Sequence, residues 1–445
     1  MVRLNLLPDM SRRSILLFVV VIVAIGFTVR ILGGLVFNYG YDVHHWAQVS
    51  AVISSGNGLY GLTGYFYTPV WGYILGLVDY LQQCCLTLGD TAYRVLGALC
   101  LEDEPGYISS NTTSLAYTFW IKLPLYVVDL VVAVLVYIVV RDYTGDGRKA
   151  LLGFALWFLN PLVISSPMVQ GMFDNIVALM VLLCVMLLMR SRYFGAGILL
   201  MLAILLKLFP FFLAPLLVAY VLVANGRSIR RALVPLVSAV AGALLTLVII
   251  LLPQFMDGTL EYCFTFITAR SGGSDALSQA LGLGSVAAYL LILLLSALIA
   301  WVFYRRADES DLDNELLLAL IINLLVTFLY PPTPQYLVLF IPFLTIFVLV
   351  RDWGFARPLM GLSLAATLFL FSNGFTLLLT LATGTDLLSV ETVVSLSEST
   401  AGVRMAVYYL AGVLQYLCIL YLILRSFRSG HFDRFLRRKA PGIEP

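Results

Sequence analysis

The apolar run SILLFVVVIVAIGFTVRILGGLVF at residues 14–37 is followed directly by the polar stretch NYGYDVHHW at residues 38–46. A helix needs about 20 consecutive apolar residues to cross a bilayer, so the run is long enough for one span. The polar stretch holds Asp42, His44 and His45, and the whole chain has only three histidines. A carboxylate at the edge of the hydrocarbon layer indicates a functional site, and an ordinary polar loop is the alternative.

Apolar runs of this kind recur over the 445 residues, of which 61% are hydrophobic and 12% charged. Soluble domains have about 25% charged residues, so the composition predicts an all-α polytopic membrane protein. The net charge of +2 gives no reason to expect nucleic acid as a partner. The chain has no Gly-rich phosphate loop and no zinc-type Cys/His spacing. We therefore expect no resident cofactor, and the sequence does not support a divalent metal site.

The N-terminus resembles a signal peptide, because Arg3, Arg12 and Arg13 precede the first apolar run. That run is too long and lacks a small-residue cleavage site, which predicts an uncleaved signal anchor. The six cysteines form no metal-binding pattern. Three of them fall on the predicted outer side, where a disulfide could form, but the sequence does not reveal its partners; they are Cys84, Cys85 and Cys100.

Lysine and arginine in short loops prefer the cytoplasm, and their positions predict about 12 spans with both termini cytoplasmic. The expected spans are 14–37, 121–140, 150–166, 175–190, a hairpin of two short arms over 194–224, then 231–252, 284–304, 314–330, 335–350, 356–376 and 402–424. The hairpin is expected to break at Pro210, with Lys207 near its outer turn. Its arms are short for a core of about 30 Å, which indicates packing within the protein.

This topology leaves two large outer loops, residues 38–120 and 253–283. The apolar stretch 66–88 within the first loop has two interpretations. We favour an interfacial or re-entrant helix on the outer face; the alternative is a pair of spans formed with residues 93–101. The segment 102–114 is acidic and polar, with no positive cluster to hold it in the cytoplasm.

Several polar residues gather at the outer level of this topology. Lys122 and Asp129, seven residues apart, share one helix face, and Arg30 lies about 10 Å in from the outer end of the first span. Structural ion pairs, for example Lys122–Asp129 or Arg30 with a neighbour, are the plainer explanation for these three. The other members of the group are Asp42, Asp174, Lys207, Arg270, Gln335 and Tyr336. Two carboxylates at one interface, with cations nearby, favour a site.

This combination suits one kind of chemistry. A carboxylate can act as a general base on a hydroxyl group, and cations can stabilise a phosphate leaving group. A hydrophobic groove at bilayer depth can hold a lipid tail. Together they indicate transfer of a sugar from a lipid phosphate to a hydroxyl acceptor on the outer face. His44 and His45 could instead form a metal site with Asp42, but adjacent residues point to different faces of a helix, which argues against both binding one ion.

A series of short motifs resembles the GT-C fold integral-membrane glycosyltransferases that use polyprenyl-phosphate sugars, especially the mannosyltransferase-like branch. Their order and spacing carry the resemblance, not any single piece. They are Gly26-Phe-Thr-Val-Arg30, Tyr41-Asp42, Trp46-Ala47, Gly56-Asn-Gly-Leu-Tyr60, Tyr65-Phe-Tyr-Thr-Pro69, Lys122-Leu-Pro124 with Asp129, Trp157-Phe-Leu-Asn-Pro161, Gln170-Gly-Met-Phe-Asp174, Leu206-Lys207 with Pro210, and Pro334-Gln335-Tyr336. The chain departs from the branch in two places. Tyr-Thr-Pro replaces Tyr-Pro-Pro, and the Trp expected before the displaced Gln170 is absent.

The resemblance implies a seven-span module with a large first outer loop, and it implies roles for the two acids. Residues 1–252 would form this module, including the outer loop 38–120. Residues 253–283 would be the second outer loop, and residues 284–445 a C-terminal transmembrane module with a basic cytoplasmic tail. Asp42 matches the catalytic base early in the first outer loop. Asp174 matches a second catalytic acid in the next outer loop, which supports the acceptor or the base. The donor would be a polyprenyl-phosphate sugar, with mannose favoured, and the acceptor a glycan, glycolipid or protein.

The remaining candidates follow from the same reasoning. Lys207 and Arg270 are candidates for the donor phosphate. Substrate-positioning candidates are His44, His45, Tyr67, Gln170, Lys122, Gln335 and Tyr336. Aromatics such as Tyr65, Tyr67 and Trp71 could line a sugar site, and an interfacial aromatic belt is an equally good explanation.

A secondary transporter or lipid flippase is the alternative function. Its charges should lie near the bilayer midplane, at broken helices in two matching halves. Here the break at 206–210 has no clear counterpart in the second half, and the charges lie at one face. A non-catalytic membrane scaffold would leave the pair of acids unexplained.

Overall fold

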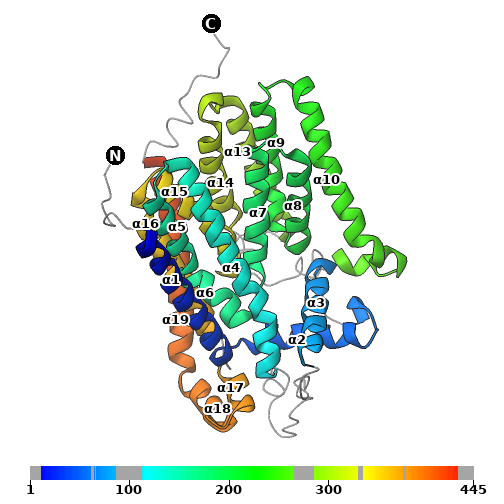
Figure 1. Cartoon of the computed structure of the whole chain (residues 1–445), viewed down its shortest axis with the longest axis vertical. Helices are drawn as coiled ribbons and strands as arrows, with labels where there is room; N and C mark the ends of the chain where they lie inside the picture. Colours follow the sequence, from blue (N-terminus) through cyan, green and yellow to red (C-terminus); the bar gives the residue numbers. More distant parts are fainter. Residues whose placement is uncertain are drawn as a thin grey trace. The chain divides into compact units, whose positions relative to one another are not determined.

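The computed structural model describes residues 12–61, 65, 67–86, 113–264, 285–328, 334–373 and 377–428. Helices are the only regular elements within these ranges, as predicted (Figure 1). Six segments are long and apolar enough to cross a membrane. They are α1 (Arg12–Val36), α4 (Leu115–Thr144), α10 (Ile229–Met256), α13 (Ser285–Arg306), α19 (Ala401–Arg428), and η7 (Trp353–Phe355) with α16 (Ala356–Asn373). The protein is therefore a polytopic all-α membrane protein.

The other expected spans also contain helices, but shorter ones. A bent pair formed by α5 (Gly147–Phe158) and the segment Pro161–Gln170 would make a seventh span. Shorter helices are α7 (Asp174–Met189), α8 (Tyr193–Leu206), η3 (Phe209–Leu213) with α9 (Ala214–Ala224), α14 (Leu312–Thr327), and η6 (Pro334–Leu339) with α15 (Ile341–Val350). The number of crossings, about 12, stays a prediction, because several of these helices are shorter than a bilayer core of about 30 Å requires.

The expected single span 150–166 is bent by 43° after Phe158. The sequence explains the break, since Pro161 cannot donate a backbone hydrogen bond and suits only the start of a helix. Asn160 caps the new helix α6 (Pro161–Ser165) by accepting from the backbone N–H groups of Leu162 and Val163. A π-helical turn, η2 (Ser166–Gln170), follows and ends at Gly171 with a left-handed φ of 61°.

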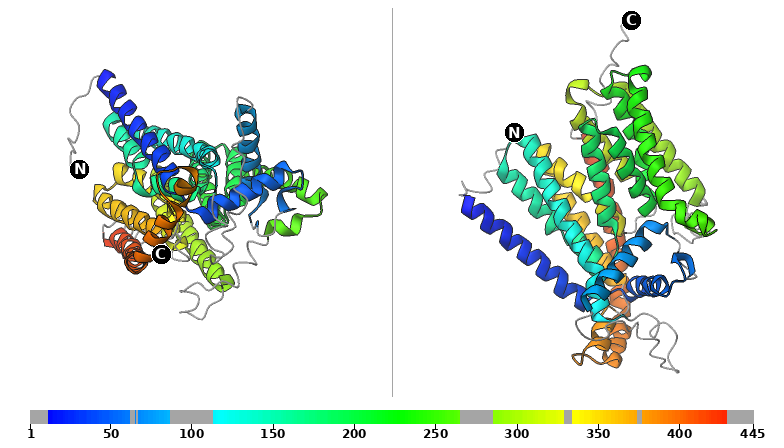
Figure 2. Two further views of the ribbon diagram at one scale, coloured as in Figure 1. Left: turned by 90° about the horizontal axis from the view of Figure 1, so that it is seen from below. Right: turned by 45° about the vertical axis from the view of Figure 1, so that its right-hand side comes forward.

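The chain divides into two compact units that interleave along the sequence. Unit 1 comprises Met1–His44, Ala92–Asn175 and Leu344–Gly412. In it, α1 packs along α4 and against α5 and η2 (Figure 2). Small residues permit this close approach, because a Cβ at Gly26 would overlap the Phe158 ring and one at Gly33 the Met168 sulfur. Short helices α17 (Leu379–Gly384) and α18 (Val390–Ser399), which the sequence did not predict, also belong to unit 1.

Unit 2 comprises His45–Thr91, Ile176–Phe343 and Val413–Pro445. Its helices α8 and α10 pack backbone against backbone: a Cβ at Gly197 would overlap the carbonyl of Ala239, and one at Gly242 that of Phe194. Close contact at small residues is the usual way in which membrane helices associate. Helix α9 packs against α13 and α14 in the same unit.

The segment after α1 contains three more helices, α2 (Gly40–Ser54), η1 (Leu59–Gly61) and α3 (Pro69–Leu86). Residues 40–46 form the first two turns of α2 and are not a loop, while a functional site there stays a prediction. Helix α3 forms residues 69–86 of the expected apolar stretch 66–88, and its position at the interface or across the bilayer stays a prediction.

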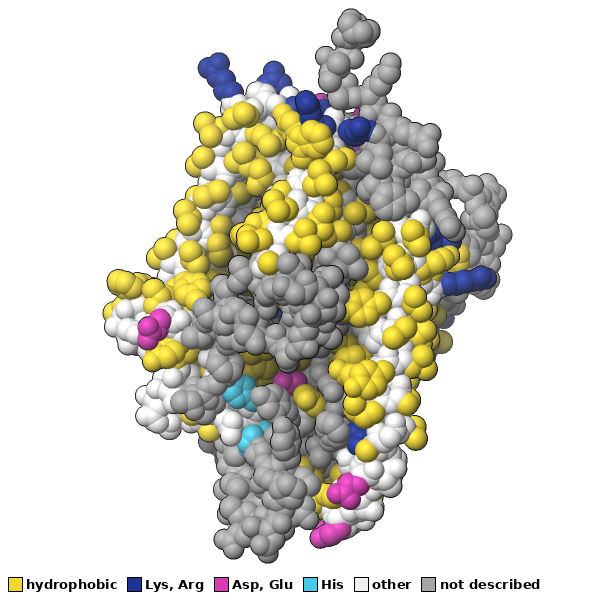
Figure 3. Space-filling model, turned by 180° about the vertical axis from the view of Figure 1, so that it is seen from behind, with side chains coloured by type: hydrophobic (Ala, Val, Ile, Leu, Met, Phe, Trp, Pro, Cys, Tyr) yellow, Lys and Arg dark blue, Asp and Glu magenta, His cyan; other side chains and the backbone are white. Residues whose placement is uncertain are grey.

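Hydrophobic side chains cover much of the surface seen in Figure 3. On α10, Leu233, Val234 and Val237 are 54%, 74% and 57% exposed. Exposed apolar faces of this size are costly in water but suit contact with lipid.

Candidate active site

Asp42 lies in the first turn of α2, directly after the membrane helix α1 ends. Its side chain is half-buried. The N-terminus of a helix carries a partial positive charge, which favours an ionised carboxylate at this position. His44, two residues further, is 8% exposed, and His45 is half-buried. Asp42 therefore combines a negative charge with partial access at the end of a membrane span.

Asn38 and Lys122 form a buried polar node beside this helix start. Lys122 Nζ donates to Gly34 O at 2.9 Å, to Asn38 Oδ1 at 3.0 Å and to Met168 O at 2.6 Å. Both side chains are at most 1% exposed. The node connects α4, the end of α1 and η2 within unit 1. Lys122 does not pair with Asp129, which was one predicted structural pairing.

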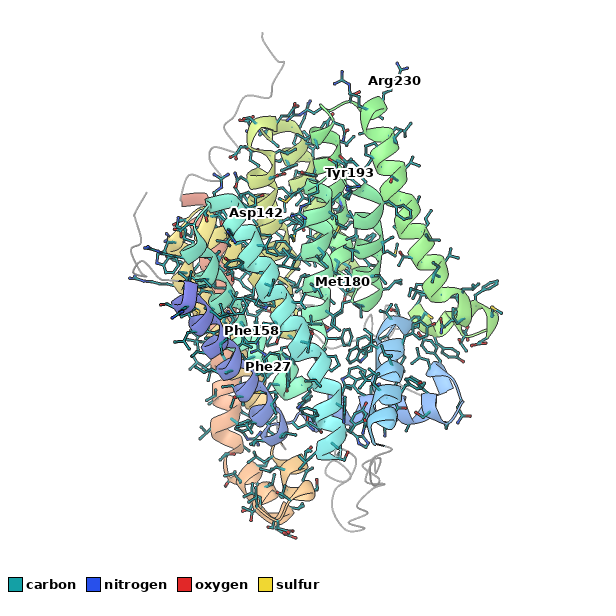
Figure 4. The ribbon with its side chains drawn as sticks, viewed as in Figure 1. Phe27, Asp142, Phe158, Met180, Tyr193 and Arg230 are labelled. Carbon is teal, nitrogen blue, oxygen red and sulfur yellow. The ribbon has the colours of Figure 1, made fainter. Side chains whose placement is uncertain are left out.

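The partner of Asp129 is instead Arg30. Arg30 Nε donates to Asp129 Oδ2 at 2.9 Å, and both side chains have 0% exposure. The guanidinium also lies 4.4 Å from the centroid of the Phe158 ring, and Phe158 in turn contacts Phe27 of α1, with 5.8 Å between ring centroids (Figure 4). A structural ion pair for Arg30 and Asp129, the plainer explanation from the sequence, agrees with this geometry.

The second carboxylate, Asp174, begins α7 and is 3% exposed. Its neighbour Asn175 donates to Asp129 Oδ1 at 2.9 Å and to Leu125 O at 2.7 Å, which ties the start of α7 to α4. Gln170 lies four residues before Asp174 and is 5% exposed. Its Oε1 accepts no hydrogen bond from the described part of the chain. Buried polar atoms normally have a partner, so this oxygen is a candidate contact for a substrate. π-Helical turns are frequent at functional sites.

Aromatic side chains form a connected cluster in unit 2. Trp46 contacts Tyr67 and Trp71, with ring centroids 5.6 and 5.7 Å apart. His45 stacks on Tyr65 at 6.4 Å. The Tyr65 hydroxyl accepts from Gly72 N at 2.9 Å and donates to Thr68 O at 3.1 Å, which holds the turn before α3 in shape. Burial raises the pKa of the Tyr65 phenol well above 10.0, so the phenol is neutral at physiological pH.

Two further candidates meet in unit 2. Lys207 caps the C-terminus of α8 and has an extended backbone. Its Nζ lies 4.4 Å from the centroid of the Tyr336 ring. Tyr336 also contacts Phe209, with 4.6 Å between centroids. Gln335 is the neighbouring residue on η6 and is half-buried. The structure thus brings Lys207 and Tyr336 into a cation–π contact.

Some predictions concern residues outside the described ranges. Arg270 and Cys100 lie there, and the side chains of Cys84 and Cys85 are not described either. Among the described residues, no group of three or more His, Cys, Asp or Glu side chains could hold a metal ion.

Two residues of unit 1 that sequence reasoning did not single out have clear roles in the geometry. Asn38 and Asn175 each make several buried hydrogen bonds. The signal was present, because Asn38 directly follows the first apolar run and Asn175 directly follows Asp174. A neutral amide is common in loops, however, and the sequence alone does not reveal its partners.

Comparison with known proteins agrees with the resemblance found in the sequence. The sequence model of glycosyltransferase family 87 matches residues 113–332, which contain Lys122, Asp129, Gln170, Asp174 and Lys207. No curated protein matches the chain. The match favours a transferase over a transporter. Combined with the helical membrane fold, it identifies the chain as a GT-C-type membrane glycosyltransferase similar to glycosyltransferase family 87.

Proposed function

We propose that the enzyme transfers a sugar, with mannose favoured, from a polyprenyl-phosphate donor to an acceptor hydroxyl on the extracytoplasmic face. The acceptor is a glycan, a glycolipid or a protein. Both termini are then cytoplasmic, as the distribution of lysine and arginine predicts. The observation that carries the proposal is the position of Asp42: a half-buried carboxylate in the first turn of α2, directly beyond a membrane span, in a glycosyltransferase.

In the proposed reaction Asp42 takes the proton of the acceptor hydroxyl. The oxygen forms a bond to the anomeric carbon of the donor sugar while the bond from that carbon to the phosphate oxygen breaks. The electron pair leaves with the polyprenyl phosphate, and attack from the opposite side inverts the configuration. Gln170, the last residue of η2, and Asp174, the first residue of α7, are the candidates for orienting the acceptor or the sugar.

Cations stabilise the negative charge that develops on a phosphate leaving group. Lys207 and Arg270 are the candidates for this role. Roles in positioning the substrate for His44, His45, Tyr67, Gln335 and Tyr336 are part of the same proposal, whereas Lys122 would act only through its contacts with the protein. Polyprenyl phosphate would reach the site from the lipid, which suits an enzyme whose helices expose apolar faces.

The test uses purified protein, a membrane lipid extract and radiolabelled polyprenyl-phosphate mannose, with glucose and arabinose donors in parallel. Wild type is compared with Asp42→Asn, which keeps the shape of the side chain but cannot accept the proton. Asp386→Asn is the matched control, because Asp386 is an exposed acid elsewhere in unit 1. We expect label to move into a new lipid or glycan with wild type and the control, and not with Asp42→Asn.

A wild-type rate in Asp42→Asn would refute the role of the base. Transfer from the glucose or arabinose donor alone would refute mannose while leaving the mechanism in place. Nuclear magnetic resonance of the product then gives its anomeric configuration. Retention of the donor's configuration would contradict direct attack by the acceptor.

A further inference from the structure

Asn38, the buried residue between α1 and α2, uses its backbone N–H and both polar atoms of its side chain. Its backbone N–H donates to Leu377 O at 2.7 Å. Its Nδ2 donates to Thr380 Oγ1 at 2.9 Å and to Thr113 Oγ1 at 3.3 Å. Its Oδ1 accepts from Lys122 at 3.0 Å. One residue therefore joins the α1–α2 junction to the two later segments of unit 1, residues 92–175 and 344–412.

The Lys122 ammonium is similarly saturated. An ammonium has three N–H donors, and here three protein oxygens, Gly34 O, Asn38 Oδ1 and Met168 O, lie within 3.0 Å of Nζ. Gly34 O is one of the last four carbonyls of α1, which lack partners inside the helix. The charge therefore caps α1 at the end where a cation is favoured. With its donors engaged on the protein, Lys122 has none left for a substrate.

The chain on either side of this node leads to the two candidate carboxylates. Tyr39 N donates to Val169 O at 2.6 Å, and α2 with Asp42 begins one residue later. Met168 and Val169 belong to η2, which leads to Asp174. The same small group of hydrogen bonds thus fixes the entry to α2 and the approach to α7.

We propose that Asn38 and Lys122 are positioning residues, which hold the first turn of α2 and its carboxylate in register with η2. The inference rests on the proposed role of Asp42. Misplacing a catalytic group by about 1 Å can slow a reaction by about 100-fold, so an anchor that touches no substrate can still control the rate.

Residues 377–380 hold Asn38 through the Leu377 carbonyl and the Thr380 hydroxyl, and they lie outside the family match at 113–332. Helix α17 therefore helps to hold Asn38 in place, and is not only a connection between α16 and α19. Its contact can be removed gently, because Thr380→Val deletes one hydroxyl and keeps the shape. Thr383→Val is the matched control: the Thr383 hydroxyl donates only to the backbone carbonyls of Leu379 and Thr380 in its own helix.

The experiment compares wild type with Asn38→Leu, Thr380→Val and Thr383→Val in two measurements. One is kcat and KM for transfer from the radiolabelled donor. The other is amide hydrogen exchange of peptides covering residues 39–46. We expect Asn38→Leu to lower kcat by about 10- to 100-fold with little change in KM, and to speed exchange in those peptides. Thr380→Val should show smaller changes in the same direction, and Thr383→Val none.

The exchange measurement separates this inference from the proposed function. Unchanged exchange at 39–46 in both Asn38→Leu and Thr380→Val would overturn the positioning role, whatever the activity. A wild-type kcat in Thr380→Val despite faster exchange would also overturn it. Faster exchange and lower kcat, together with full activity of Asp42→Asn, would instead refute Asp42 as the base and leave the anchor in place. Asn38→Leu removes three side-chain hydrogen bonds and can impair folding, so Thr380→Val keeps the test decisive.

Discussion

The buried ion pair between Arg30 and Asp129 leads to a prediction about the order of stability of four proteins. These are wild type, Asp129→Leu, Arg30→Met and the double variant. Both side chains have 0% exposure, and one hydrogen bond of 2.9 Å joins them. Removing one member of such a pair leaves an uncompensated buried charge, which costs about 3–5 kcal/mol. Replacing both by apolar residues of similar volume is often neutral, because the cost of desolvating two charges disappears with the pair.

The two single variants should differ. In Asp129→Leu the guanidinium keeps its charge, since arginine is not deprotonated in proteins, and its buried Nε loses an acceptor. In Arg30→Met the carboxyl can become neutral by binding a proton, and Asn175 still donates to it at 2.9 Å. The free energy of unfolding should therefore fall by the full 3–5 kcal/mol or so in Asp129→Leu. It should fall by less in Arg30→Met and by least in the double variant.

Thermal unfolding of the detergent-solubilised protein measures this order as Tm. The control is Asp142→Leu, which changes an exposed acid at the end of the same helix (Figure 4) and should shift the free energy of unfolding by less than about 0.5 kcal/mol. Losses that simply add in the double variant would refute the reasoning. A wild-type Tm for Asp129→Leu would do the same.

Three further predictions concern unit 2. Gly242→Ala should lower Tm by overpacking, at a cost of about 1–3 kcal/mol, because the new methyl meets the backbone of Phe194, whereas Gly402→Ala, in open space, should not. Arg227→Ala should also lower Tm, because its half-buried guanidinium binds the carbonyls at the end of α13. The free energy of unfolding should fall by on the order of 1–3 kcal/mol. An unchanged Tm would contradict this. Tyr65→Phe concerns pH. Burial holds the pKa of Tyr65 above 10.0, so its stabilising effect is complete below pH 10 and is lost as the pH rises further. Wild type should therefore lose more stability than Tyr65→Phe between pH 9 and 11 or so, and equal losses would refute it.

The periodicity and length of the apolar runs were enough to predict most helices, because a membrane leaves helices as the main solution for a long apolar chain. The break at Lys207 followed from Pro210 in the same way. The short helices α17 and α18 were missed, since six and ten residues of mixed polarity give no clear periodic signal. The bend at Asn160-Pro161 was visible as a motif, but its effect on the span was not anticipated.

For the site, the sequence indicated which polar residues are unusual, and the structure shows which of them meet. The predicted Lys122–Asp129 pair was wrong, because helix spacing shows only that two residues share a face. Arg30 from α1 forms the ion pair with Asp129 instead. Asn38 was overlooked because its importance lies in partners that are 75 to 342 residues away in the sequence. Contacts over such distances depend on tertiary packing, which a single sequence does not encode in a readable pattern.

The π-helical turn η2 has a consequence for how this part of the sequence can change over time. Two hydrogen bonds that tie it to other described parts of unit 1 are accepted by main-chain oxygens, those of Met168 and Val169. A carbonyl is the same in every amino acid, so substitutions at these two positions leave the attachment chemistry intact as long as the turn keeps its shape. Both side chains are buried, so among homologues we expect only other apolar residues at 168 and 169, while Lys122 on the other side of the bond stays fixed.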